Sequence, residues 1–265
     1  LLVTALIPAL GWRYTFVAIA LLLLFVMFPL AIGLVRNRPE NYGLKPDGML
    51  TGKQSAAADK GDLETEKPIA EENWTRGEAI KTPAFWIMAA GVATIAMLVT
   101  ALTFHIVSIF EDQGLTASQA AAAYLPIGIA TAFFNFTSGF LVERIKLRYL
   151  LAGSLFAMAG SLVMALFLQN LVTTVAFGII LGTAAGLMST VNSVGWANYY
   201  GRLHLGSITG ITSTILIAGS SLGPLPFGFA RDLLGNYDGV LLISAIIPLT
   251  LGILALFMRK PQKAR

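Results

Sequence analysis

Seven long apolar runs constrain the fold of this chain more than any other feature. A helix needs about 20 apolar residues to cross the hydrocarbon core of a bilayer. The runs are Tyr14–Val35, Pro83–Phe110, Thr116–Val142, Tyr149–Leu168, Leu171–Trp196, Ser207–Ala230 and the shorter Val240–Met258. Residues 1–10 are interpreted as the tail of one more helix, and because no Met begins the chain, we expect it to start inside a larger protein. The sequence predicts an all-α membrane protein with about seven full transmembrane helices and the tail of an eighth.

Composition favours the same class. Hydrophobic residues make up 56% of the chain and charged residues 12%, against roughly 25% charged residues in an ordinary soluble domain. The chain has no cysteine, which excludes thiolate metal sites and thiol catalysis, and the sequence shows no catalytic constellation, metal cluster or cofactor motif. The net charge of +4 does not indicate nucleic-acid binding, because the basic residues gather between the apolar runs.

The distribution of lysine and arginine predicts the orientation. Residues 36–82 carry eight of the eighteen Lys and Arg and nine of the fourteen Asp and Glu, which is typical of a solvated loop. If this loop is cytoplasmic, sixteen of the eighteen basic residues fall on the cytoplasmic side, and only Arg13 and Arg231 fall outside. The chain then divides into the end of one helical bundle (1–35), a central cytoplasmic loop (36–82), a six-helix bundle (83–258) and a cytoplasmic tail (259–265).

Capping motifs predict where several helices begin. Thr75 and Glu78 have the spacing of a capping box, and so do Thr116 and Gln119. The first box predicts a short amphipathic helix on the membrane surface within the loop. Thr82 followed by proline predicts the N-cap of the next span. Trp74 and Trp196 are expected at the membrane interface, where tryptophan is enriched.

Glycines recur at four-residue spacing inside the predicted spans. In lipid, small residues at this spacing let helix backbones approach closely, so we expect these positions to pack against other helices. They are Gly178, Gly182 and Gly186, and the pairs Gly206 with Gly210 and Gly219 with Gly223.

No Asp, Glu, Lys or Arg lies in the middle of a predicted span, although such charges usually mark ion or substrate paths. The candidates for substrate binding are therefore His105, Thr131, Asn135 and Asn192. For His105 the alternative is an interfacial or helix-bonding histidine. For the two asparagines it is an interhelical hydrogen bond, worth about 1 kcal/mol.

Five short motifs follow one another along the chain: GWRYTF (11–16), RNRPENYGLKPDG (36–48), GFLVERIKLR (139–148), YYGRLHLGSITGI (199–211) and GPLPFGFARDLLGNY (223–237). Together they resemble the major facilitator superfamily, and in particular its bacterial monocarboxylate-porter and oxalate:formate-antiporter branches. The resemblance implies a major facilitator-type helical bundle in a prokaryotic inner membrane. This chain would then hold the tail of helix five, helix six, the central loop and helices seven to twelve.

The third motif resembles the superfamily's loop between helices eight and nine. On this resemblance, Gly139, Glu143, Arg144 and Arg148 are candidates for a conformational-gating loop. The charges alone predict that Arg144, Lys146 and Arg148 meet the negative end of the preceding helix dipole. They also predict that Glu143 pairs with one of them or with the next helix N-terminus. A basic cluster that only fixes topology is the alternative, and the two roles are compatible.

The resemblance fails at the charged substrate site of these branches. In monocarboxylate porters an arginine holds the substrate carboxylate and works with an aspartate one turn earlier on the helix. The matching positions here are Asn135 and Thr131. The lysine of the eleventh helix in oxalate:formate antiporters is absent from SITGITSTILIAGSS. The substrate is then neutral, or it is an anion whose charge is met by other helices.

These observations predict a secondary active transporter that moves a small organic solute by alternating access, with a monocarboxylate-like organic anion as one option. Its partners would be this small-molecule substrate, a coupling proton or ion, and membrane lipid, with no nucleic acid and no required oligomer. The alternatives are a drug/proton-type exporter of the same superfamily and a non-transporting membrane sensor. An enzyme would need paired charged residues or His and Asp within the spans, which this sequence lacks.

Overall fold

The structure, a computed structural model, describes residues 2–34 and 72–263, with side chains described for 10–33 and 72–263. The predicted segment 36–71 thus lies outside the described residues. The chain divides into two compact units, Leu1–Ile69 and Ala70–Arg265. The described parts are helical and contain no strand. The helices are α1 (Leu2–Leu34), α3 (Arg76–Ala79), α4 (Pro83–Asp112), α5 (Ala117–Arg144), α6 (Leu147–Ala165), α7 (Leu171–Tyr200), α8 (Leu205–Leu222), α9 (Pro224–Leu234) and α10 (Asp238–Phe257).

Seven helical segments within these described parts are long and apolar enough to cross a membrane. They are Leu10–Gly33, Pro83–Asp112, Ala117–Arg144, Leu147–Ala165, Leu171–Tyr200, Leu205–Leu234 and Asp238–Phe257. Each corresponds to one predicted run, so the all-α membrane fold is confirmed. The sixth segment consists of α8 and α9, which meet at Gly223. Pro224 and Pro226 follow this break, and since neither can donate a backbone hydrogen bond, they favour an interruption here.

The first unit is represented by α1, which is broken at Gly11. This residue has a φ of 72° and a ψ of 162°, a conformation that glycine adopts readily and other residues rarely do. The hydroxyl of Thr15 donates a hydrogen bond to the carbonyl of Gly11 at 2.8 Å. Beyond the break, nearly every large apolar side chain of α1 is exposed within its own unit, Phe25 at 69%. Such a helix needs lipid or other helices around it.

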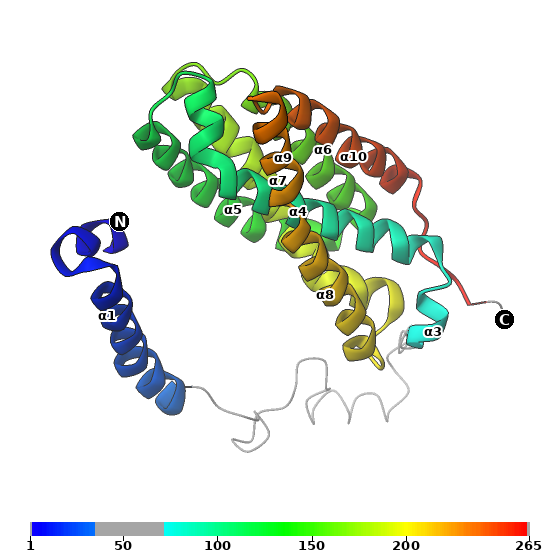
Figure 1. The fold of residues 1–265 in the computed structure, drawn as a ribbon. Coiled ribbons are helices and arrows are strands. Elements are labelled where there is room, and N and C mark those ends of the chain that lie inside the picture. The colour runs from blue at the N-terminus through cyan, green and yellow to red at the C-terminus, as the bar shows by residue number, and fades with distance from the viewer. Residues whose placement is uncertain (1, 35–71, 264–265) are drawn as a thin grey trace. The chain divides into compact units, whose positions relative to one another are not determined.

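The second unit is a bundle in which α4 is central. This helix contacts α5, α6, α7, α8, α9 and α10. Other close pairs are α5 with α7 and α6 with both α7 and α10 (Figure 1). The core around α4 consists of large side chains that are almost fully buried, among them Phe85, Met88, Leu98, Leu102, Leu151, Leu155 and Met158.

Glycines set the closest helix contacts of this bundle, as the sequence predicts for two of the three groups. A Cβ at Gly182 of α7 would lie 2.5 Å from the carbonyl oxygen of Ile127 on α5. A Cβ at Gly223 would lie 2.2 Å from the carbonyl oxygen of Met97 on α4. The prediction is wrong for Gly206 and Gly210 within the described residues, where an added Cβ meets no atom within 4 Å. Spacing alone does not decide which helix faces have a neighbour.

The predicted helix starts are confirmed at Thr75, Thr82 and Thr116, each of which accepts a hydrogen bond from a backbone N–H three residues on. The helix after Thr75 has only four residues. Its Glu78 accepts hydrogen bonds from the backbone N–H of Thr75 and lies 3.1 Å from Lys263 Nζ. The backbone bond and the lysine lower the pKa of the Glu78 carboxyl to about 2, so this group is ionised at neutral pH.

Both tryptophans expected in the membrane-interface belt are buried in protein. Trp74 is 7% exposed and packs edge-on to Tyr200, while its backbone N–H donates to the Tyr200 carbonyl at 2.9 Å. Trp196 is 1% exposed and lies between Phe85 and Tyr200. The physical reason is volume: these rings fill the space where the end of α7 crosses the start of α4. The prediction of an interface position used only their place along the chain, whereas their burial depends on how the helices pack.

Candidate functional site: a polar seam and a basic loop

An exposed group of polar side chains lies where α5 meets α7. Asn135 of α5 donates a hydrogen bond from Nδ2 to Ser189 Oγ on α7 at 2.6 Å, and both residues are exposed. Three residues further along α7, Asn192 is also exposed and accepts a hydrogen bond from Trp196 Nε1 at 3.3 Å. The structure therefore brings Asn135 and Asn192 to the same pair of helices. We call this exposed group of Asn135, Ser189 and Asn192 the polar seam.

A second hydrogen bond between α5 and α7 is buried next to the polar seam. The hydroxyls of Ser138 and Thr190 are 2.5 Å apart, and Ser138 also donates to the Asn135 carbonyl at 3.1 Å. These hydroxyl residues and Ser189 were not among the predicted site residues. Their signal in the sequence is position, since Ser189 and Thr190 lie one turn after Gly186, where the helices are already close.

Thr131 lies at the same contact between α5 and α7, but its hydroxyl forms a hydrogen bond within α5. It is half-buried, and its hydroxyl donates to the Ile127 carbonyl at 2.7 Å. Its backbone carbonyl would be 2.7 Å from a Cβ at Gly186. Thr131 therefore lies at the close contact of α5 with α7, and its hydroxyl hydrogen is bonded within α5.

His105 contacts a different set of helices. Its Nε2 lies 3.1 Å from the Pro224 carbonyl, which can only accept, so Nε2 carries the proton. Its Nδ1 then accepts from the Tyr237 hydroxyl at 3.1 Å, and its ring stacks on Phe227. Both ring nitrogens of His105 are hydrogen-bonded in this arrangement. The histidine joins α4 to the α8–α9 break and to the residue that precedes α10.

A charged pair that the sequence did not reveal lies beside this histidine. Arg231 at the end of α9 forms a salt bridge with Asp112 at the end of α4. The same guanidinium lies over the Tyr237 ring at 5.7 Å and donates to the Gly235 carbonyl at 2.6 Å. We call the end of the bundle that holds these residues and His105 the paired end.

The candidate gating loop lies at the C-terminal end of α5. Gly139, Glu143 and Arg144 are exposed, and α5 ends at Arg144. Arg148 lies in the first turn of α6 rather than at the end of α5, which corrects the predicted dipole contact. Its Nη2 donates to the Tyr149 hydroxyl at 2.8 Å. Among the residues that the structure describes, Glu143 makes no ion pair, because the extended backbone at Ile145 and Lys146 separates the two helix ends.

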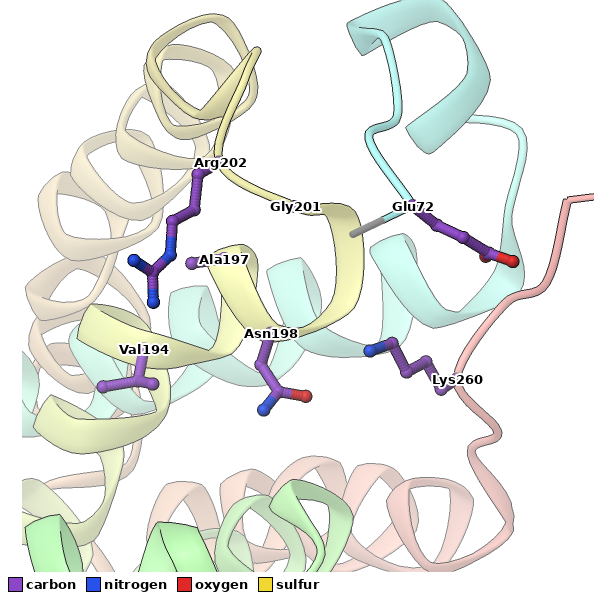
Figure 2. A pocket seen from close by; sticks show the side chains of 7 residues that line it. All are labelled: Glu72, Val194, Ala197, Asn198, Gly201, Arg202 and Lys260. Atoms are coloured by element: carbon purple, nitrogen blue, oxygen red, sulfur yellow. The ribbon is translucent and has the colours of Figure 1, made fainter. Parts of the chain in front are cut away.

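Two neighbouring pockets open at this end of the bundle, and both are lined by Asn198 and Lys260; the larger also contacts the loop. The smaller, of about 250 Å³, is lined by Glu72, Val194, Ala197, Asn198, Gly201, Arg202 and Lys260. Figure 2 shows the Lys260 ammonium facing Asn198, while the Glu72 side chain extends towards the C-terminal tail. Gly201 has a φ of 78°, and a Cβ there would lie 2.5 Å from Asn73 Oδ1. Glycine is required where the chain turns between α7 and α8.

The geometry of these residues does not identify the protein family, but comparison with known families does. The family model described as Major Facilitator Superfamily matches residues 1–224 and residues 127–265. The chain belongs to this superfamily. It is therefore an integral membrane protein and a membrane transporter, of a family whose members bind small-molecule substrates, often with coupled ions, and are not enzymes. No curated protein matches the chain. The resemblance to the monocarboxylate and oxalate:formate branches stays a prediction.

The described side chains contain no group of three or more His, Asp or Glu placed to hold a metal ion. The chemistry that the site offers is thus hydrogen bonding by neutral amides and hydroxyls in the polar seam and charge at the two ends of the bundle.

Proposed function

We propose that this superfamily member is a secondary active transporter that moves a small organic solute by alternating access, and that the polar seam contacts the solute. The observation that carries this proposal is the exposed amide of Asn135 in α5. Polar groups that face hydrocarbon are costly, so those inside spans usually face a bundle interior or a water-filled cavity. In the described bundle this amide faces outwards, which supports a water-filled path between this bundle and helices of the other half.

The free capacity of the seam supports a hydrogen-bonded solute. Within the described residues, the Asn135 side chain makes one hydrogen bond, which leaves one N–H and the amide oxygen available. No charged side chain lies beside it in the seam. A neutral polar solute fits this seam, and so does an organic anion whose charge is met by helices of the other half.

The orientation and the loop complete the proposal. We place residues 36–82 and the tail in the cytoplasm of a prokaryotic cell because the basic residues lie on that side. Gly139, Glu143, Arg144 and Arg148 would form the gating loop, since Glu143 is exposed and can pair in another conformation of the transport cycle. A coupling proton or ion is part of this proposal, and His105 is a titratable group within α4.

Transport by the purified protein in vesicles tests the proposal. We would measure uptake of labelled small organic acids and neutral solutes by the wild-type protein, Asn135→Ala and Asn192→Ala. A matched control is Thr137→Ala on α5, whose hydroxyl donates only to the Phe133 carbonyl of its own helix. Loss of one or two neutral hydrogen bonds should weaken solute binding about tenfold in the asparagine variants. Equal uptake by the asparagine variants and the control would contradict the role of the seam.

A second candidate function rests on the aromatic side chains next to the seam. Phe133, Phe136 and Phe140 of α5 are 61%, 71% and 60% exposed. A path lined by such rings also suits apolar compounds, as in a drug/proton-type exporter. Efflux of a lipophilic cation that Phe136→Ala abolishes, without uptake of any polar solute, would favour the exporter.

A further inference from the structure

The larger pocket beside the loop has a strongly positive lining. It has a volume of about 550 Å³ and lies where α5 and α10 end and α6 begins. Three segments form it: the α5–α6 junction, the last turn of α7 and the tail after α10. Its charged residues are Arg144, Lys146, Arg148, Arg259 and Lys260, against the single acid Glu143. We call it the basic pocket.

In the part of the chain that the structure describes, these five cations form no salt bridge with an acidic side chain. Across the described residues, the salt bridges involve Arg231 and Lys263, and none reaches the basic pocket. The Nε of Arg148 is buried and has no hydrogen-bond partner. A buried donor on a charged group is costly when it is left unpaired. The pocket is therefore short of negative charge in a way that an anion would relieve.

The start of α6 adds to the same imbalance. The first turn of this helix holds no acidic residue, and its N-cap Lys146 makes no side-chain capping bond. The positive end of a helix dipole thus lies beside cations rather than anions, which is the opposite of the favourable arrangement. This feature only reinforces the pocket, which rests on the five side chains and their missing partners.

We propose that the basic pocket binds a phosphate group, carried either by an anionic phospholipid headgroup or by a free phosphate ester. Guanidinium groups match phosphate oxygens in shape and charge, and three of the pocket's five cations are arginines. The pocket lies at the ends of helices that are long and apolar enough to cross a membrane, where we expect lipid headgroups. Its wall also holds Val142 and Met258, whose apolar side chains suit the first methylenes of an acyl chain. The site is separate from the polar seam.

Titration calorimetry on the purified protein in a maltoside detergent tests this inference. The probes are dioctanoyl phosphatidylglycerol, dioctanoyl phosphatidylcholine and glycerol 3-phosphate. We expect phosphatidylglycerol to bind saturably and its affinity to fall with added salt, because screening weakens exposed charge pairs. Binding of glycerol 3-phosphate with equal affinity would identify a free phosphate ester as the ligand, and its failure to bind would identify the lipid. Absence of saturable binding by both, or equal binding of the zwitterionic lipid, would overturn the proposal.

Matched charge removals locate the binding. Arg259→Gln with Lys260→Gln removes two exposed cations of the tail, so the bundle should still fold. Arg76→Gln with Lys81→Gln removes the same charge from exposed positions outside the pocket. The first pair should weaken binding on the order of tenfold or more, since each charged hydrogen bond to phosphate contributes substantially. The second should change it less than about twofold. Equal effects of both pairs would show a diffuse charge effect and refute a defined site.

Discussion

Helices α4 and α5 are similar in length, and both are apolar enough to cross a membrane, yet they differ sharply in burial. Their most apolar windows are 50% and 11% buried, respectively. The helix α4 contacts every other span of the bundle and surrounds itself with large side chains. In contrast, α5 packs mainly on α7 and leaves a row of phenylalanines and the Asn135 amide exposed. The comparison teaches that α4 forms the core of this bundle, whereas α5 lies at its edge with one side exposed.

The largest expected effect comes from the close backbone contact between α5 and α7 at Gly182. Gly182→Leu would place a branched side chain against backbone atoms of Ile127 and Thr131, which cannot move aside without separating the helices. We expect the folded yield, measured by size-exclusion chromatography, to fall to near zero. The control is Gly206→Leu, where an added Cβ meets nothing within 4 Å in the described bundle. Equal yields for the two variants would show that the α5–α7 contact is not as close as described.

The second effect compares two phenylalanines directly. Phe85 of α4 is fully buried between Trp86, Trp196 and Tyr200, whereas Phe136 of α5 is 71% exposed. Removal of a buried ring costs about 3–5 kcal/mol, because a cavity remains. Phe85→Ala should therefore lower the thermal unfolding midpoint in detergent strongly. Phe136→Ala should cost less than about 0.5 kcal/mol, as exposed positions usually do. A similar loss in both would mean that α5 is as buried as α4.

This difference between α4 and α5 marks how far the sequence could predict the structure. Apolar length predicts that both helices span, and the capping residues Thr82 and Thr116 predict where they begin. Neither signal reveals burial, because a lipid-facing side chain and a core side chain are equally apolar. The same ambiguity explains Trp74 and Trp196, which were expected in the interface belt and lie in the core. Burial in a membrane protein depends on which helices are neighbours, and that is long-range information.

The candidate site shows the same division. The exposed asparagines could be selected from the sequence because polar residues are rare within spans. Their partner Ser189 could not, since hydroxyls are common there and only the α5–α7 register brings it into contact with Asn135. Trp196 lies four residues after Asn192 on the same helix, so that contact follows from helical spacing. Likewise, the motif at 139–148 predicts a basic loop, whereas the contribution of Arg259 and Lys260 to its pocket depends on where α10 ends. The sequence identifies unusual residues such as these asparagines and the basic motif, whereas the residues that surround them depend on how the helices pack.

The third effect probes the exposed side of α5 with a charge. Asn135→Arg would cost about 2.5–3.5 kcal/mol on insertion scales if the side chain faced lipid. It should cost much less if the face lines water, so the variant should fold and shift substrate preference towards anions. Asn135→Ala should fold normally and bind solute more weakly. We would measure folded yield and solute binding for both. Failure of the arginine variant to fold, together with normal binding by the alanine variant, would show that Asn135 faces lipid or packs.

The smallest effect concerns the hydrogen bond between His105 of α4 and Tyr237 at the paired end. Tyr237→Phe removes the hydroxyl that donates to His105 Nδ1 and leaves this imidazole nitrogen without its partner. The ring itself stays, so the packing with Phe227 and the guanidinium of Arg231 is kept. The loss should be about 1 kcal/mol, the net contribution of a neutral hydrogen bond. It should appear as a small drop in the unfolding midpoint. The matched variant Tyr124→Phe removes the bond that the hydroxyl on α5 donates to the Thr103 carbonyl at an exposed position, where substitutions usually cost less than about 0.5 kcal/mol. A larger drop for Tyr124→Phe than for Tyr237→Phe would reverse the ranking of α4 over α5.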